Sequence, residues 1–590
     1  MIKTINRALF VLGCASSVAV FAQQGSSDGQ WPSYASDAGS TKYTKLGQIN
    51  ADNFSELELA WSWQSIDADI DFEEILGADA DVGFGRLQAT PLMVDGVLYM
   101  LTALNQVAAL DAASGEMLWA FDPQVYMSGP PISPLGFHHR GVAYWSNGSE
   151  ARILLATNDG YIFSLDAATG EADQDFAGGR IDMTEGIPRA ERDGYDYAGA
   201  QPLGSVSPPM VVSDIVVVQP ITSNRPRYKE RPPTWIRGYD IPTGELRWTF
   251  HSIPQQGEFG VDTWQEESWR YTGNGGVWTQ MSADLELGIV YLPTEAPTND
   301  FYGGHRPGDN LFTQSVVALD ASTGERIWHY QLIHHDIWDY DNPAAPNLID
   351  ITVDGREIKA IAQVTKQGFT YVFNRISGDP VWPIIEREVP TDVLIPGERP
   401  SPTQPFPTRP PPFTPQGLTT DDLIDFTPAL RAEAEEILTS YTYGPLYTPP
   451  TLPRDDGHRG TILRPSAGGG ANWTGAGIDP ETAILYVPSS DGVTIPFMGT
   501  LGPDESNFNY FRLANQGVAG PQGLPLLKPP YATVTAIDMN RGEIQWQVPN
   551  GVGMARVEQH PALQGVDLPP LGGGGRHAVL VTSTLLIHAQ

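Results

Sequence analysis

The chain has 590 residues and is rich in glycine (61), proline (51), tyrosine (22), phenylalanine (21) and tryptophan (15). So many turn-forming and aromatic residues exclude a disordered chain and favour an all-β protein with a substantial core. The formal net charge of −35 excludes nucleic acid and anionic lipid surfaces as expected partners, because polyanions repel an acidic protein.

The first 22 residues have the pattern of a signal peptide. Two basic residues precede an apolar run from residue 8 to about residue 20, and small residues precede the expected cleavage after Ala22. We therefore predict export to the periplasm. A second interpretation takes residues 11–14 as a lipoprotein cleavage box, which would leave a lipidated Cys14 at the new N-terminus.

Cys14 is the only cysteine of the sequence. Cleavage after Ala22 would therefore leave a chain without disulfides, cysteine-ligated metals or a covalently attached c-type haem. No later segment approaches 18 consecutive apolar residues, so we expect no transmembrane helix.

Six copies of one pattern, aliphatic-Asp-x-x-x-Gly-Glu-x-x-Trp, follow along the chain with small variations. Each copy predicts a hairpin, because glycine tolerates the positive φ of a tight turn. Five copies end in tryptophan, and a tryptophan at a fixed offset from the turn is expected to pack between successive hairpins. The turn glycines are Gly115, Gly170, Gly244, Gly324, Gly378 and Gly542.

The spacing of the copies predicts a β-propeller over residues 23–590. The first five copies are 54 to 80 residues apart, which leaves room for four-stranded blades with insertions. The interval from Asn374 to Asp538 is 164 residues and is long enough for one or two unmarked blades. We therefore predict an eight-bladed propeller with four-stranded blades.

Residues 383–453 interrupt the repeats with a proline-rich excursion. Within it, Thr427 followed by Pro428 predicts a short helix over residues 428–438, with threonine at the cap and proline in the first turn. We expect the excursion to cover one face of the propeller and to shape a substrate entrance, although a plain surface loop is the alternative.

The segment 333–341 has the densest polar chemistry of the chain, with two histidines, three aspartates, a tryptophan and a tyrosine. In an extended segment Asp339 and Asp341 share a face and Tyr340 points away. Two carboxylates on one face favour a bound cation. The alternative is a polar surface loop with solvated aspartates.

These features together resemble the pyrroloquinoline-quinone (PQQ)-dependent dehydrogenases, in the branch related to membrane-bound quinoprotein glucose dehydrogenase. The resemblance extends from about Trp31 to the C-terminus and rests on the tryptophan repeats and on five segments. These are residues 31–34, 46–50, 306–310, 334–339 and 468–473. It implies an eight-bladed propeller with PQQ near the axis and a divalent cation, usually calcium, at the edge of the quinone.

The resemblance also implies individual roles. Asp339 is the expected catalytic base and Lys366 the expected contact of the quinone oxygens. Trp278 is the expected aromatic floor, and Arg140, Asn472 and Trp473 are further expected cofactor contacts. Without the resemblance, Trp278 is interpreted as core, Lys366 as solvated and Arg140 as a structural ion-pair partner.

The expected metal ligands are Asn224, Asp339, Asp341 and Glu295. Relatives carry an asparagine where this chain has Ala296, so Glu295 is a candidate replacement for that ligand. An aspartate at the position of Asp341 also occurs in lanthanide-using relatives. Calcium is the expected ion, with a lanthanide or magnesium as alternatives.

The last residues, 581–590, stand where relatives continue through another tryptophan hairpin. This departure predicts either that the last blade is closed differently or that the sequence is a truncated copy with an incomplete last blade, and an unclosed propeller would expose strand edges.

The resulting hypothesis is a periplasmic quinoprotein dehydrogenase that oxidises an alcohol, polyol or glucose-type sugar by hydride transfer to PQQ. Ubiquinone or a separate cytochrome is the expected electron acceptor, since no haem domain is fused. The first alternative is a non-enzymatic envelope scaffold. A glycosidase or lyase is a second alternative, and it needs another carboxylate pair facing the funnel.

Overall fold

The structure is a computed structural model that describes residues 25–26, 28–71, 87–129, 131–133, 135–188, 203–222, 228–392 and 395–589. The expected signal peptide with Cys14, and the expected metal ligand Asn224, lie outside the described residues. Within these described ranges, every helix is too short or too polar to cross a membrane.

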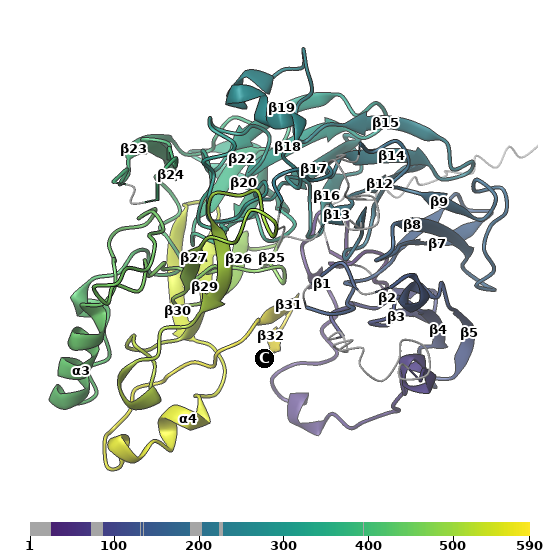
Figure 1. Ribbon diagram of the computed structural model, residues 1–590. Helices are drawn as coiled ribbons and strands as arrows, with labels where there is room; N and C mark the ends of the chain where they lie inside the picture. The colour runs from purple at the N-terminus through teal and green to yellow at the C-terminus, as the bar shows by residue number, and fades with distance from the viewer. Residues whose placement is uncertain are drawn as a thin grey trace, which may run out of the picture.

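Seven radial sheets follow one another around a common centre and form a β-propeller (Figure 1). Blades 1 to 6 follow in chain order, and neighbouring strands within each of them are antiparallel. Blade 1 contains β2 (Leu92–Val94), β3 (Val97–Leu101), β4 (Val107–Asp111) and β5 (Met117–Phe121). Blade 2 contains β6 (Ala143–Ser146), β7 (Ala151–Ala156), β8 (Tyr161–Asp166) and β9 (Arg180–Asp182).

Blades 3 to 5 continue the ring. Blade 3 contains β11 (Met210–Val212), β12 (Ile215–Val218), β14 (Ile236–Asp240) and β15 (Leu246–Phe250). Blade 4 contains β16 (Ser282–Asp284), β17 (Ile289–Pro293), β18 (Ser315–Asp320) and β19 (Arg326–Gln331). Blade 5 has three strands, β20 (Asn347–Val353), β21 (Arg356–Val364) and β22 (Thr370–Asn374).

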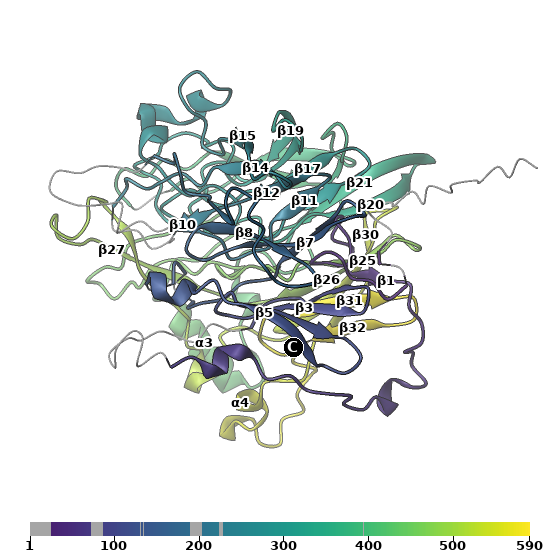
Figure 2. The same ribbon diagram turned by 90° about the vertical axis from the view of Figure 1, so that its right-hand side faces the viewer.

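Blade 6 contains β25 (Gly477–Asp479), β26 (Ile484–Ser490), β29 (Ala532–Asp538) and β30 (Glu543–Pro549). Blade 7 combines an N-terminal strand, β1 (Tyr43–Thr44), with β31 (Ala578–Thr582) and β32 (Leu586–Ala589). β1 runs parallel to β31, with Tyr43 opposite Val581. The two ends of the described chain therefore close the ring side by side (Figures 1 and 2).

The prediction of eight blades is wrong, because the described residues of the long interval between the fifth and sixth repeats form insertions and no unmarked blade. It contains the hairpin of β23 (Ile384–Glu388) and β24 (Thr403–Pro407) and the helix α3 (Pro428–Leu438). It also contains β25 and β26, which belong to the same blade as the sixth repeat, and a second hairpin. That hairpin is formed by β27 (Ile495–Gly499) and β28 (Phe511–Gln516).

The predicted helix is confirmed over residues 428–438, and the Thr427 hydroxyl accepts a hydrogen bond from Leu430 N at 3.2 Å. The helix lies at the periphery of the molecule (Figure 1). Minor elements are β10 (Leu203–Gly204), β13 (Ile221–Thr222), α4 (Ala555–Glu558) and 3-10 helices at 54–56, 66–69, 125–128, 261–263, 265–270, 420–422, 521–523 and 561–563.

The repeats form the outer hairpins of blades 1 to 6, as predicted. The pairs β4–β5, β14–β15, β18–β19 and β29–β30 are complete, whereas the second and fifth copies close through single bridges, Leu165 to Ala172 and Phe373 to Pro380. The hydrophobic core is divided among the blade interfaces. Val217 of blade 3, for example, shares a cluster with Val290 of blade 4.

Tryptophans connect successive blades, which confirms the predicted packing for four of the five repeat tryptophans; Trp546 of the sixth copy is 39% exposed and contacts Tyr486 within its own blade. The Trp248 indole lies so close to Gly324 of the next blade that a Cβ on that glycine would be 2.6 Å from the ring. Its N–H donates to Ala321 O at 2.9 Å. The same arrangement pairs Trp61 with Gly115, Trp119 with Gly170, Trp328 with Gly378 and Trp382 with Gly542. The second repeat has no tryptophan, and Ala177 occupies its place against Gly244.

Candidate active site

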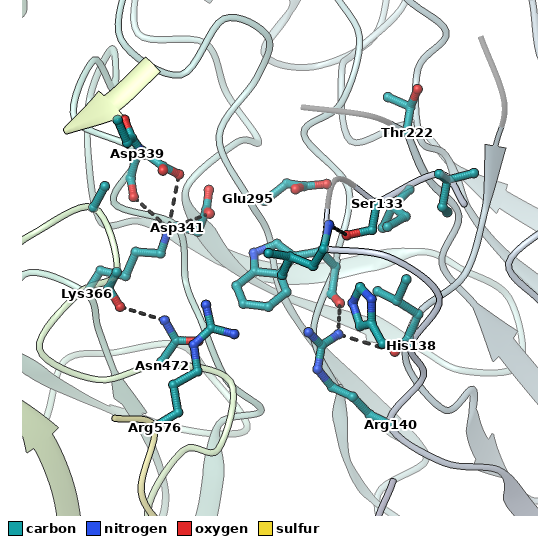
Figure 3. A pocket seen from close by; sticks show the side chains of 18 of the residues that line it. Ser133, His138, Arg140, Thr222, Glu295, Asp339, Asp341, Lys366, Asn472 and Arg576 are labelled. Atoms are coloured by element: carbon teal, nitrogen blue, oxygen red, sulfur yellow. Dashed lines mark hydrogen bonds and ion pairs between the residues drawn. The ribbon is translucent and has the colours of Figure 1, made fainter. Parts of the chain in front are cut away.

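A cavity of about 280 Å³ lies among loops from successive blades. Figure 3 shows Asp339, Asp341, Glu295 and Lys366 on one side, and His138 and Arg140 on the other. None of the described residues of the 383–453 excursion lines this cavity. The cavity lining therefore does not support the expectation that the excursion shapes a substrate entrance. The other lining residues are Ile132, Ser133, Leu135, Val206, Ile221, Thr222, Trp278, Ala467, Gly468, Asn472, Thr494, Arg512, Asn515 and Arg576.

The segment between β19 and β20 presents two carboxylates to the cavity. Trp338 and Tyr340 are buried in the core, and the Tyr340 hydroxyl donates to Pro465 O at 2.6 Å. These anchors leave Asp339 and Asp341 as the cavity-lining residues, as the alternation predicted. The backbone is not extended throughout, since Asp339 has a φ of 60°, a left-handed conformation that aspartate tolerates better than most residues.

Asp336 stabilises this loop through hydrogen bonds. Its carboxylate accepts hydrogen bonds from Trp338 N at 3.1 Å, Tyr340 N at 3.2 Å and the Gln314 side chain at 2.9 Å. Asp336 is absent from the cavity wall. Its contacts therefore fix the loop that carries the other two aspartates.

Lys366, at the β21–β22 turn, joins those two aspartates. Its ammonium donates to Asp339 O at 2.7 Å, to Asp339 Oδ1 at 3.0 Å and to Asp341 Oδ2 at 2.9 Å. Burial by itself lowers the pKa of Lys366, but the two carboxylates outweigh it and raise that pKa. The side chain is 6% exposed, so the interpretation of Lys366 as a solvated lysine is wrong.

The two aspartates differ in their proton affinity. Burial, followed by the repulsion of Asp341, raises the pKa of Asp339 well above its usual range, despite the attraction of Lys366. For Asp341, burial is outweighed by Lys366 and by a hydrogen bond from Ala296 N at 2.8 Å, so its pKa is lowered. The pair therefore holds one readily ionised carboxylate beside one with a high affinity for a proton.

Glu295 is a third acid in the wall. It follows β17 and is 6% exposed, and its Oε1 has no hydrogen-bond partner among the described residues. Burial, and then the charges of Asp341 and Asp300, raise its pKa well above the usual range. Even so, within the described part of the chain no three His, Cys, Asp or Glu side chains are grouped to hold a metal ion.

Arg140 forms the opposite wall between two indoles. Its guanidinium lies 5.1 Å from the ring centres of both Trp278 and Trp473, and it donates to Ser207 Oγ at 3.0 Å and Val206 O at 3.2 Å. Burial lowers its pKa to about 9. Among the described residues it has no carboxylate partner, so the interpretation as a structural ion pair finds no support there.

The structure also reveals cavity residues that the sequence patterns did not indicate. Arg512 and Asn515 come from the β27–β28 hairpin, which carries none of the repeat features, and Arg576 follows a run of four glycines. The glycine run ahead of a basic residue was the one available signal. Of the expected contacts, Asn472 lines the cavity, whereas Trp473 lies behind Arg140.

Comparison with known proteins shows the family of this chain. The family model described as "PQQ: Glucose/ethanol/alcohol dehydrogenase, beta-propeller domain" matches residues 31–590. The chain is 29% identical to quinoprotein glucose dehydrogenase A of Acinetobacter calcoaceticus, over 93% of this chain and 70% of the relative. It is 30% identical to the quinate/shikimate dehydrogenase (quinone) of Acinetobacter baylyi, over 88% of this chain and 66% of the relative.

Solved structures share the fold. The quinohemoprotein alcohol dehydrogenase from Comamonas testosteroni superposes with a TM-score of 0.61 at 23% identity, over 94% of this chain and 68% of that one. A europium-containing methanol dehydrogenase gives a TM-score of 0.58 at 22% identity, over 95% and 81%. With the family match covering nearly the whole sequence, the chain belongs to the PQQ-dependent glucose/ethanol/alcohol dehydrogenase family of β-propeller oxidoreductases.

Proposed function

We propose that this chain binds PQQ in the described cavity and oxidises the CH–OH group of an alcohol, polyol or sugar there. The observation that carries the proposal is the buried contact of Lys366 with Asp339 and Asp341, which faces Arg140 across the same cavity. A base, a cationic donor and a planar aromatic wall are what hydride transfer to a quinone requires of the protein.

The residues present fit PQQ, which carries three carboxylates on a planar ring system. Arg140 is a buried cation without a carboxylate partner among the described residues, and such a cation is costly unless an anion compensates it. Trp278 offers a ring face, and Asn472 and Arg576 offer polar contacts in the same cavity. Trp473 supports Arg140 from behind.

When bound, PQQ supplies an electrophilic carbonyl that accepts the hydride of the substrate carbon. Asp339 takes the proton of the substrate hydroxyl, and its raised pKa makes the ionised carboxylate a stronger base. Lys366 keeps Asp339 oriented through two contacts and brings a positive charge to the place where negative charge develops.

For the metal, we propose Ca²⁺, with a lanthanide or Mg²⁺ as alternatives, and Glu295, Asp339 and Asp341 as candidate ligands. Among the described residues these three acids are not grouped closely enough to hold an ion, and Lys366 contacts two of them, so metal binding would require the side chains to rearrange. The unpartnered Oε1 of Glu295 and the mutual repulsion of the acids support this proposal. Calcium prefers oxygen ligands of this kind. Asn224, a fourth candidate ligand, lies outside the described residues.

Two further parts of the proposal come from the sequence. Ubiquinone or a separate cytochrome would be the electron acceptor. The N-terminal 22 residues direct export to the periplasm.

A reconstitution assay tests the proposal. The purified chain is loaded with PQQ and CaCl₂, and reduction of an artificial electron-accepting dye is followed with glucose, ethanol and glycerol. Quenching of tryptophan fluorescence reports PQQ binding independently of turnover. We expect binding together with reduction by at least one substrate. Failure of both would contradict the proposal.

A further inference from the structure

The β27–β28 hairpin is inserted in blade 6 between β26 and β29. The four-stranded sheet of that blade is complete without it. The hairpin nevertheless places two side chains, Arg512 and Asn515, in the wall of the same cavity as Asp339, and Thr494 immediately before β27 joins them. An insertion that the blade does not need, but that reaches the reaction cavity, is a natural place for substrate recognition.

A β-bulge explains how two residues three positions apart reach one face. Phe497 pairs with Ala514 and Met498 pairs with Arg512, so Leu513 is an extra residue in β28. Side chains alternate along a strand, and one extra residue shifts this alternation by one position. Arg512 and Asn515 therefore point to the same side, while Leu513 is 44% exposed.

Arg512 is held in place but keeps donors available. Its side chain is 9% exposed, its guanidinium lies 5.1 Å from the Phe301 ring centre, and its closest approach to Asp300 is 3.4 Å. Among the described residues, its guanidinium makes this ion pair and no hydrogen bond of good geometry. A guanidinium has five N–H donors, so several remain for an oxygen atom of a ligand.

The surrounding charges indicate what kind of oxygen fits. Asp300 already balances the charge of Arg512 at 3.4 Å, and Asp339 lines the same cavity. A carboxylate group of a substrate bound at this place would be repelled by Asp300 and Asp339. An uncharged hydroxyl can accept from Arg512 and donate to the Asn515 amide oxygen without that repulsion.

We propose that Arg512 and Asn515 form a subsite for a second hydroxyl group of the substrate, at a distance from the CH–OH group that Asp339 deprotonates. The substrate class is therefore a neutral polyol or sugar. Simple alcohols lack the second hydroxyl, and hydroxy acids place a carboxylate beside the acids. This inference rests on the proposed function and narrows it.

The test compares three substrates in the chain loaded with PQQ and Ca²⁺. Glycerol has the second hydroxyl, 1-propanol lacks it, and quinate carries a carboxylate. We expect wild-type kcat/KM to be highest for glycerol. Arg512→Leu should lower kcat/KM for glycerol roughly 10- to 100-fold, as expected for loss of a hydrogen bond to a charged group, and change 1-propanol less than about 3-fold.

Two variants keep the test decisive. Asn515→Ala changes an exposed residue and leaves the ion pair of Asp300 with Arg512 intact. It should lower kcat/KM for glycerol about 3- to 10-fold. Gln516→Ala is the matched control, because it alters the next residue of β28 on the opposite side and should leave all three substrates unchanged. Circular dichroism checks that each variant is folded.

Equal losses for glycerol and 1-propanol in Asn515→Ala would overturn the subsite. So would a wild-type preference for 1-propanol or quinate over glycerol. In these cases the dehydrogenase activity stands and only the subsite fails. Absence of PQQ binding and of turnover with every substrate would overturn the proposed function and the subsite together.

Discussion

Asp339 is the residue on which the proposed chemistry depends most directly. We expect Asp339→Asn to lower kcat by about 100-fold or more, because the amide cannot take the substrate proton. The amide has nearly the same shape and can still accept from Lys366, so PQQ binding and the fold should persist. Dye reduction measures the first effect, and fluorescence quenching with circular dichroism measures the second. Global unfolding of the variant would instead indicate a structural role for Asp339.

Glu398 is a residue whose protonation should control stability in acid. It accepts hydrogen bonds from Gly303 N at 2.6 Å and from buried His335 at 2.8 Å. Burial by itself raises its pKa, but these contacts and the charge of Arg306 outweigh it and lower the pKa to about 2. Because this value lies below the unfolded one, Glu398 stabilises the fold above about pH 4.5, and the contribution is lost as pH falls toward 2.

The lowered pKa of Glu398 corresponds to roughly 3 kcal/mol of the free energy of unfolding. Glu398→Gln should therefore destabilise the protein at pH 7 and flatten the loss of stability between about pH 4.5 and 2. Chemical denaturation at a series of pH values measures both. If the free energy of unfolding of the variant falls as steeply below about pH 4.5 as that of the wild type, other carboxylates control acid unfolding.

At the scale of elements, the stacking of tryptophan on turn glycine is a contact between blades. Gly324 and Gly288 close successive hairpins of blade 4, with φ of 73° and 67°. A Cβ on Gly324 would overlap the Trp248 ring at 2.6 Å, whereas a Cβ on Gly288 meets nothing within 4 Å. Substitution of Gly288 therefore tests the backbone strain alone, whereas substitution of Gly324 tests the same strain together with the contact between blades.

We expect Gly288→Ala to cost about 1–2 kcal/mol, because alanine is strained in the left-handed region. Gly324→Ala should cost about 2 kcal/mol more, because Trp248 must move away from its neighbouring blade. Thermal or chemical unfolding of the two variants gives the difference. Equal losses would mean that the tryptophan contact contributes nothing to stability.

Elements were predictable from the sequence where the signal was local. Turn glycines and tryptophans indicated six hairpins, and Thr427 with Pro428 marked the start of α3, because turns and caps depend on a few neighbouring residues. The β27–β28 hairpin was missed, since its bulge and its contact with the cavity depend on residues far away in the chain. Arg512 was missed with it.

At the scale of the whole molecule, the blade count could not be read from spacing alone. A gap of 164 residues has the same length whether it holds a blade or insertions. The cavity was predictable in part, since Asp339, Asp341, Lys366, Glu295 and Arg140 were all expected and all line it. Their contacts were not predictable, because Lys366 meets the aspartates only after two blades pack together.

The net charge of −35 is a property of the whole chain with a measurable consequence. Self-repulsion opposes the compact state, and salt screens it as the Debye length falls from about 30 Å at 0.01 M to about 8 Å at 0.15 M. We expect Tm to rise by a few degrees over that range of NaCl. A constant or falling Tm would indicate that local ion pairs outweigh the net repulsion.

The pairing of Tyr43 with Val581 ties a strand near the beginning of the chain to one near its end. On the ribosome, β1 is synthesised long before β31 exists, and each completed blade can pack on the previous one while β1 still lacks its partner. The exposed backbone groups of β1 form an unpaired edge during this interval. The chain is therefore prone to aggregation through this edge for most of its synthesis. A chaperone that covers edge strands can bind β1 during this time, and its binding site disappears when the ring closes.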